Sequence, residues 1–182
     1  MKIYFIGSHS SGKTTLCRYV AEKYKLPMLP EVARIILAEK ELHLDSLRTN
    51  LDLVDEYQAS VFYRQLKEEE NKESFVSDRS FDNLAYAAQH SRVAGQLASE
   101  TMFKHYVETL KDPNVVMFFV RPSKATLRGD GVREQITWDG VVAIDAMIKF
   151  MLEIFGLRYF QINTDAIQER IRYVDAVLSL VS

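Results

Sequence analysis

The chain has 182 residues, the length of one domain, and its 47% hydrophobic content is enough for a single core. A net charge of −2 argues against a protein built mainly to coat nucleic acid, and the one cysteine, Cys17, excludes a disulfide framework and a cysteine-rich metal site. The sequence shows neither a signal peptide nor the roughly 18 apolar residues that span a bilayer. We therefore expect a cytoplasmic protein with no membrane partner.

The first half of the chain alternates short apolar runs with helical patterns. The run KIYFIG at 2–7 predicts a buried strand, and residues 13–24 behind it predict a helix. Residues 26–30, LPMLP, with prolines at 27 and 30, predict a brief second strand, followed by a helical segment at 32–42. A long helix is expected over 51–72, with its charged end, KEEENKE, in solvent.

The second half continues the same alternation. We expect strands at 74–78, 114–120 and 158–163, and a polar loop at 121–139. Helices are expected after the first of these strands through residue 86, over 96–110, over 144–155 and over 167–181. Five short strands alternating with helices predict an α/β fold, a parallel sheet with helices on both faces and right-handed crossovers. With no linker or repeat, residues 1–182 are expected to form one domain.

A phosphate-binding motif follows the first strand. Residues 7–14, GSHSSGKT, fit G-x-x-x-x-G-K-[ST] at every fixed position, between a predicted strand and a predicted helix. Backbone N–H groups in such a loop can surround a triphosphate without side-chain bulk. Lys13 is expected to reach the β- and γ-phosphates and Thr14 to ligate magnesium; the alternative is a serine-rich turn before an ordinary helix. The predicted phosphate-binding set is Gly7, Ser8, His9, Ser10, Ser11, Gly12, Lys13, Thr14 and Thr15.

Residues after the third strand indicate which kind of P-loop protein this is. Asp78 ends that strand, where a carboxylate near magnesium is needed, although it could instead cap the following helix. Motor ATPases usually place a glutamate there to polarise a water, so the SDRS sequence at 77–80 argues against efficient hydrolysis. The NTD sequence at 163–165 does not match the guanine-recognition pattern of GTPases. These features favour a phosphotransferase.

Two further motifs resemble known P-loop kinases. Residues 78–80, DRS, with Ala85 and Tyr86 resemble the signature of thymidylate and deoxynucleoside kinases. Residues 130–134, DGVRE, resemble the D-G-x-R lid of the kinases that include bacterial ribosylnicotinamide kinase domains. The resemblance extends from the P-loop through the final helix. It implies a P-loop NTPase fold with strand order 2-3-1-4-5 and a mobile lid at about 121–139.

The resemblance also implies roles for single residues. Glu31 matches the carboxylate that takes the proton of the acceptor hydroxyl; the alternative is an acid favoured by the helix dipole. Arg79 matches an arginine that holds the acceptor. Arg133, with Arg128 as a second candidate, matches lid arginines that close over the transferring phosphoryl group; surface salt bridges are the alternative. The predicted catalytic set is Lys13, Glu31, Asp78 and Arg133.

Other residues are candidates for the acceptor side. Arg34 lies three residues beyond Glu31, on the same predicted helix face, and Tyr86 is a candidate platform for a base. Aromatic residues at helical spacing are usually core, so each of these rings has a packing alternative. The aromatic candidates are Tyr57, Phe62, Tyr63, Phe81 and Tyr86.

The sequence thus predicts a kinase that moves the γ-phosphoryl group of ATP, with Mg²⁺, to a nucleoside or nucleoside monophosphate. The DRS and Ala-Tyr features favour a pyrimidine deoxynucleotide, whereas the DGVR lid favours a ribosylnicotinamide-type acceptor. A phage-type kinase acting on a modified pyrimidine in DNA is a further alternative, which the low net charge disfavours. An ATP-dependent regulatory module is the alternative from another class. A homodimer is left open.

Overall fold

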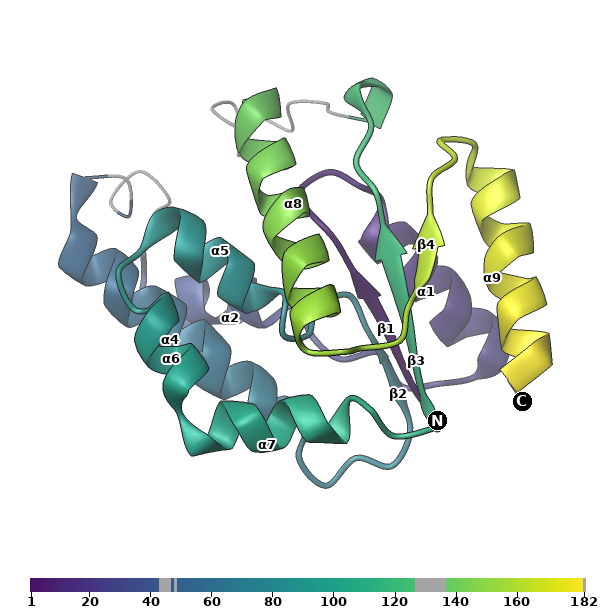
Figure 1. Ribbon diagram of the computed structural model, residues 1–182, viewed down its shortest axis with the longest axis horizontal. Helices are drawn as coiled ribbons and strands as arrows, with labels where there is room; N and C mark the ends of the chain where they lie inside the picture. Colours follow the sequence, from purple (N-terminus) through teal and green to yellow (C-terminus); the bar gives the residue numbers. More distant parts are fainter. Residues whose placement is uncertain (43–46, 48, 127–136, 182) are drawn as a thin grey trace.

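The structure, a computed structural model, describes residues 1–42, 47, 49–126 and 137–181 (Figure 1). Its strands are β1 (Lys2–Ile6), β2 (Phe75–Ser77), β3 (Val115–Val120) and β4 (Phe160–Ile162). Its helices are α1 (Lys13–Tyr24), α2 (Val32–Glu39), α4 (Leu51–Glu69), α5 (Asn83–His90), α6 (Ala94–Ser99), α7 (Thr101–Thr109), a 3-10 turn (Lys124–Thr126), α8 (Trp138–Ile154) and α9 (Ile167–Val181). Among the helices of the described residues, none combines the length and the apolar character needed to span a bilayer.

The strands form one parallel sheet in the order β2-β1-β3-β4. β1 is central, and its residue Tyr4 pairs with Ser77 of β2 and with Met117 of β3. Because all strands point the same way, the loops that follow them meet along one edge of the sheet. The P-loop motif, which follows β1, lies on this edge.

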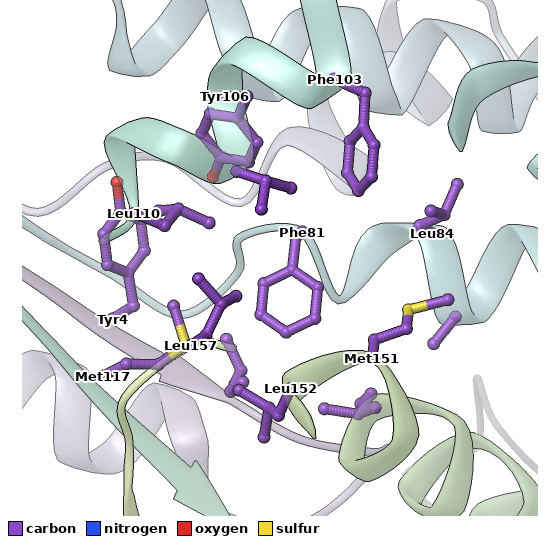
Figure 2. Packing of buried hydrophobic residues seen from close by; sticks show 14 of the residues in the cluster. Tyr4, Phe81, Leu84, Phe103, Tyr106, Leu110, Met117, Met151, Leu152 and Leu157 are labelled. Atoms are coloured by element: carbon purple, nitrogen blue, oxygen red, sulfur yellow. The ribbon is translucent and has the colours of Figure 1, made fainter. Parts of the chain in front are cut away.

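Alternating residues of β1 bury into two different layers. Ile3 and Phe5 pack with α1 and α9, whereas Tyr4 and Ile6 pack with the helices from α4 to α8 on the opposite face. Figure 1 shows this three-layer arrangement, with α1 and α9 on one side of the sheet and α5, α7 and α8 on the other. The larger layer contains Phe81, Phe103, Met151 and Leu152, whose packing Figure 2 shows.

The predicted second strand is wrong, and the described residues form four strands in place of five. Residues 26–30 make only a single parallel bridge, between Met28 and Val76. Leu29 N donates to the Val76 carbonyl (2.8 Å), and Val76 N donates to the Pro27 carbonyl (2.9 Å). Pro27, whose backbone faces β2, has no N–H group to extend the ladder, and the pairing stays limited to this bridge. The bridge still places this segment beside β2, as the predicted order required.

Two expectations for the helices also change. The predicted helix at 96–110 is divided into α6 and α7 at Glu100, which has extended backbone angles (φ −67°, ψ 142°). The charged end of α4 was expected in solvent, but Glu69 is only 5% exposed. Its carboxylate accepts hydrogen bonds from Tyr4 (2.6 Å) and Tyr106 (2.9 Å), and Gln65 donates a third (2.7 Å). The pattern of charges did not show that one of them points inward.

Candidate active site

The P-loop needs glycine at both of its fixed glycine positions. Gly7 has a φ of +148°, and a Cβ atom there would lie 2.3 Å from the carbonyl oxygen of Val120 at the end of β3. Gly12, which has a φ of +91°, immediately precedes α1, and a Cβ atom would lie 2.9 Å from Arg170 Nη1. The loop is therefore pressed against β3 on one side and against a buried arginine on the other.

Lys13 is buried inside the loop that it follows. Its side chain belongs to the first turn of α1, and the residue is 6% exposed. Nζ donates to the carbonyl of Ser8 (2.6 Å) and to Oγ of Ser11 (3.3 Å). The ammonium group thus lies over the loop, beside the backbone N–H groups at the start of α1, and this combination attracts anions.

Thr14 and Asp78 place two hard oxygen atoms together. Thr14 Oγ1 donates to Asp78 Oδ2 at 2.6 Å, joining the first turn of α1 to the end of β2. Magnesium in nucleotide sites takes one or two carboxylates together with substrate phosphates, so this pair fits Mg²⁺. The described residues contain no cluster of three or more acidic, histidine or cysteine side chains, which a dedicated all-protein metal site would need.

Arg79 and Tyr86 hold the carbonyl of Gly7 at the start of the loop. Arg79 Nη1 donates to the Gly7 carbonyl (3.3 Å) and to the Tyr86 hydroxyl (3.0 Å), and that hydroxyl also donates to the Gly7 carbonyl (2.9 Å). The guanidinium lies 4.6 Å from the centre of the Tyr86 ring, in a cation–π contact. Burial alone would lower the pKa of Arg79, but Tyr86, Asp82 and other neighbours raise it above its usual value. Arg79 is therefore a fixed cation at the base of the P-loop.

Asp82 is a buried carboxylate that sequence reasoning did not select. It is fully buried, accepts a hydrogen bond from the Ser80 N–H (2.7 Å) and lies 3.4 Å from Arg79 Nη1. Burial raises the pKa of Asp82, and the cations of Arg79 and Lys13 oppose that rise. Its role in the structure is to hold the turn that follows Asp78.

A cavity of about 270 Å³ lies in front of the loop. Glu31 and Arg79 line it together with the P-loop and the Thr14–Asp78 pair. Glu31 is the residue before α2, makes no side-chain cap bond to that helix, and pairs with Arg34 Nε at 2.7 Å. The residues that line the cavity are His9, Ser10, Ser11, Gly12, Lys13, Thr14, Thr15, Glu31, Asp78 and Arg79.

The structure brings most predicted site residues together, with some exceptions. Gly7 and Ser8 of the motif lie behind the cavity lining, as does Tyr86, which is 7% exposed. The Arg34 side chain is 67% exposed and does not line the cavity. The other aromatic candidates pack in the core, apart from Tyr63, whose hydroxyl contacts Glu100 at the surface. Arg128 and Arg133, and with them most of the predicted lid, lie outside the described residues.

The fold and the loop define a P-loop α/β protein. Residues 2–170 match the AAA domain family, and the chain therefore belongs to that family. Comparison with curated proteins gives no match.

Solved kinase structures share this fold over nearly the whole chain. A deoxyadenosine kinase from M. mycoides with bound dCTP is similar with a TM-score of 0.69 at 15% identity, covering 99% of this chain and 100% of that one. A NadR protein in complex with NR gives 0.71 at 19% identity, covering 98% of this chain and 50% of that one. A shikimate kinase from Acinetobacter baumannii in complex with shikimate gives 0.59 at 12% identity, covering 99% and 92%. These similarities confirm the P-loop kinase fold that the sequence motifs predicted.

Besides Asp82, a second buried charged residue near the loop was not selected from the sequence. Arg170 of α9 is 2% exposed and contacts the carbonyl of Ser11. In the sequence, the apolar residues of this helix recur at helical spacing beside Arg170, at Ile167, Ile171, Val174, Leu178 and Val181. The buried face contains Arg170, Val174, Val177 and Leu178. Arg170 precedes the buried residues Val174, Val177 and Leu178 by four, seven and eight positions, and this helical spacing was the available signal.

Proposed function

We propose that this protein is a kinase that transfers the γ-phosphoryl group of ATP to a nucleoside or a nucleoside monophosphate. The observation that carries the proposal is the composition of the cavity. Lys13 and the Thr14–Asp78 pair lie on its phosphate side, and Glu31 and Arg79 line the same cavity. A phosphate cradle that opens onto a carboxylate and a guanidinium is suited to a second substrate that has a hydroxyl group.

Each group has a chemical task in this proposal. Thr14 and Asp78 would hold Mg²⁺, which neutralises charge on the phosphoryl oxygens when it is bound. Lys13 stabilises the same oxygens, because its ammonium group is fixed over the loop. Glu31 accepts the proton of the acceptor hydroxyl, and Arg79 holds the acceptor or its phosphate. Arg133, with Arg128, closes over the phosphoryl group and excludes water, which would otherwise compete as acceptor.

The preferred acceptor in this proposal is a deoxynucleoside or its monophosphate, with a pyrimidine base. The DRS and Ala-Tyr residues that favour it include Arg79 at the cavity and Tyr86 behind it. Structures of the similar M. mycoides deoxyadenosine kinase hold dCTP, dATP and dCMP, which supports a deoxynucleoside class. The similar NadR structure holds NR, so a ribosylnicotinamide-type acceptor is the second candidate to be tested.

The direct test is a screen of acceptors by product mass. The protein is incubated with Mg–ATP and, separately, with deoxynucleosides, their monophosphates, ribosylnicotinamide and DNA that contains a modified pyrimidine. We expect a gain of one phosphate on a deoxypyrimidine acceptor, loss of that product in Lys13→Ala, and unchanged transfer in Lys67→Ala, whose side chain is on the exposed side of α4. Phosphate released only to water, whichever acceptor is added, would contradict the proposal and favour a nucleotide-dependent regulatory module.

A further inference from the structure

Arg170 is a buried cation next to the phosphate-binding loop. It lies in the first turn of α9, on the face that also buries Val174, Val177 and Leu178 against the sheet. Burial lowers the pKa of its guanidinium, with Asp165 acting in the opposite direction. Burying a charge is costly unless hydrogen bonds compensate for the lost water, so the contacts of this side chain indicate its purpose.

Those contacts join two separate segments. Nη1 donates to the carbonyl of Ser11 in the P-loop, and Nε donates to the carbonyl of Thr164 (2.6 Å), in the turn between β4 and α9. Nη2 lies 3.7 Å from Asp165 Oδ1, an ion-pair distance, and finds no hydrogen-bond acceptor among the described residues. One planar guanidinium thus links the loop after β1 to the turn after β4.

The contact with Ser11 fixes the direction of a neighbouring amide. The peptide group between Ser11 and Gly12 is planar and trans, so its carbonyl and its N–H point in opposite directions. The carbonyl points toward Arg170, which does not line the cavity, whereas Ser11 and Gly12 do. Holding the carbonyl on the α9 side therefore turns the Gly12 N–H toward the cavity side.

We propose that Arg170 is a positioning residue for the nucleotide: it aims the Gly12 amide at the polyphosphate and ties the P-loop to the turn after β4. The inference rests on nucleotide binding by the proposed kinase. Arg170 acts through the backbone without itself touching the nucleotide. Both tied segments lie along the carboxyl edge of the parallel sheet, where ligands of such sheets bind. The turn is also connected to the residues after β3, because Ser123 Oγ donates to Asp165 Oδ2 (2.7 Å).

The test compares Arg170→Met and Arg170→Lys with Arg172→Met, an exposed arginine of the same helix. Affinities for Mg–ATP and Mg–ADP are measured by calorimetry, and the folded state is checked by thermal unfolding. We expect Arg170→Met to weaken both affinities by roughly 10- to 100-fold, the range for losing hydrogen bonds to a charged group. Arg170→Lys keeps the charge but cannot hold both carbonyls in a planar fork, so it should show a smaller loss, and Arg172→Met none.

Two further measurements distinguish positioning from general support of the fold. In the NMR spectrum, addition of Mg–ADP should shift the Gly12 amide resonance strongly in the wild type and weakly in Arg170→Lys. In the transfer assay, KM for ATP should rise while KM for the acceptor stays unchanged. If Arg170→Met does not fold, the affinities and the Gly12 amide shift of Arg170→Lys test the proposal.

The possible failures are separable. Wild-type protein that binds no Mg–nucleotide would overturn the proposed function itself. Wild-type affinity in a folded Arg170→Met or Arg170→Lys protein, with the Gly12 shift unchanged, would overturn only the role of Arg170.

Discussion

The two sides of the cavity are held in place in different ways. On the phosphate side, the carbonyls of Gly7 and Ser11 are bound by buried side chains from other elements, namely Arg79, Tyr86 and Arg170. On the opposite side, Glu31 is partly exposed and pairs with Arg34, whose side chain is 67% exposed. The loop is thus supported from several directions, whereas the Glu31 carboxylate is paired with a neighbour that solvent can reach.

This difference is consistent with the demands of phosphoryl transfer. Reacting atoms must be placed to within fractions of an ångström, and buried hydrogen bonds to backbone give that accuracy. A polyphosphate has the same shape whichever acceptor is used, so its site gains from being fixed in advance. An acceptor side built from partly exposed groups can adjust to its substrate, at the cost of weaker preorganisation.

The largest effect is expected at the Thr14–Asp78 pair, the proposed magnesium site on the phosphate side. Asp78→Asn removes a carboxylate charge from the Thr14–Asp78 pair, so kcat with Mg–ATP should fall by roughly 10³-fold. Raising the Mg²⁺ concentration should recover part of the loss, which steady-state assays at increasing Mg²⁺ will measure. Asp52→Asn, at a 90% exposed side chain, is the matched control. Full activity of Asp78→Asn at low Mg²⁺ would exclude this carboxylate from the metal site.

The next effect concerns the support behind the phosphate side. Glu69 accepts a hydrogen bond from Tyr106, whose hydroxyl also bonds Ser80 in the turn after Asp78 (2.8 Å). Figure 2 shows Tyr4 and Tyr106 near each other at the edge of the core. Burial raises the pKa of Glu69 from 4.5 to about 7, despite the opposing hydrogen bonds from Gln65, Tyr4 and Tyr106.

A raised carboxyl pKa has a defined sign for stability. Between pH 4.5 and about 7 the folded protein binds a proton that the unfolded chain has released, so the free energy of unfolding falls as pH rises through this window. The Glu69 contribution to that fall is ~3 kcal/mol at most. Urea unfolding of Glu69→Gln from pH 5 to 8 should show a flatter slope than the wild type, and Glu70→Gln, at an exposed neighbour, should not. Equal slopes in all three proteins would contradict the assignment.

A somewhat smaller effect is expected on the acceptor side. Glu31→Gln keeps the shape of the side chain but removes the base, so kcat should fall by roughly 10²-fold with little change in Mg–ATP affinity. Glu39→Gln, at an exposed residue at the end of α2, should leave kcat unchanged. Quenched transfer assays measure kcat, and calorimetry measures the affinity for Mg–ATP. If Glu31→Gln retained full activity, the acceptor side would lack its proposed base.

The smallest effect should come from Arg34. Its pair with Glu31 is exposed, and exposed ion pairs contribute little, so Arg34→Ala should change kcat/KM for the acceptor by less than about fivefold. A loss above tenfold, measured across the same acceptor panel, would show that the acceptor side is fixed more tightly than its exposure indicates.

The phosphate side was the part that could be read from the sequence. Fixed spacing from Gly7 to Thr14 encodes a backbone conformation, and Asp78 could be placed because carboxyl ends of parallel strands meet at one edge. The structure confirms a parallel α/β fold, with Thr14 and Asp78 in contact. The sequence was sufficient here because the motif and the strand end fix the positions of these residues along the chain.

The supporting contacts could not be read in the same way. Glu69 stood in a charged run and Arg170 beside an apolar stripe, and which side of a helix faces inward depends on packing between distant elements. Tyr86 was selected for the acceptor, yet it donates to the Gly7 carbonyl, because the orientation of α5 decides where the ring points. The prediction of a strand at 26–30 was wrong for a local reason, because prolines in this segment limit backbone hydrogen bonding.

Those two prolines also affect the outside of the sheet. β2 is one of the two edge strands of the sheet, and an open strand edge can recruit a second molecule through unpaired backbone groups. Here Pro27 and Pro30 run along that edge, with Met28 making the single bridge. The segment covers β2 but offers few donors of its own, so it should protect the protein from intermolecular β-aggregation at this edge.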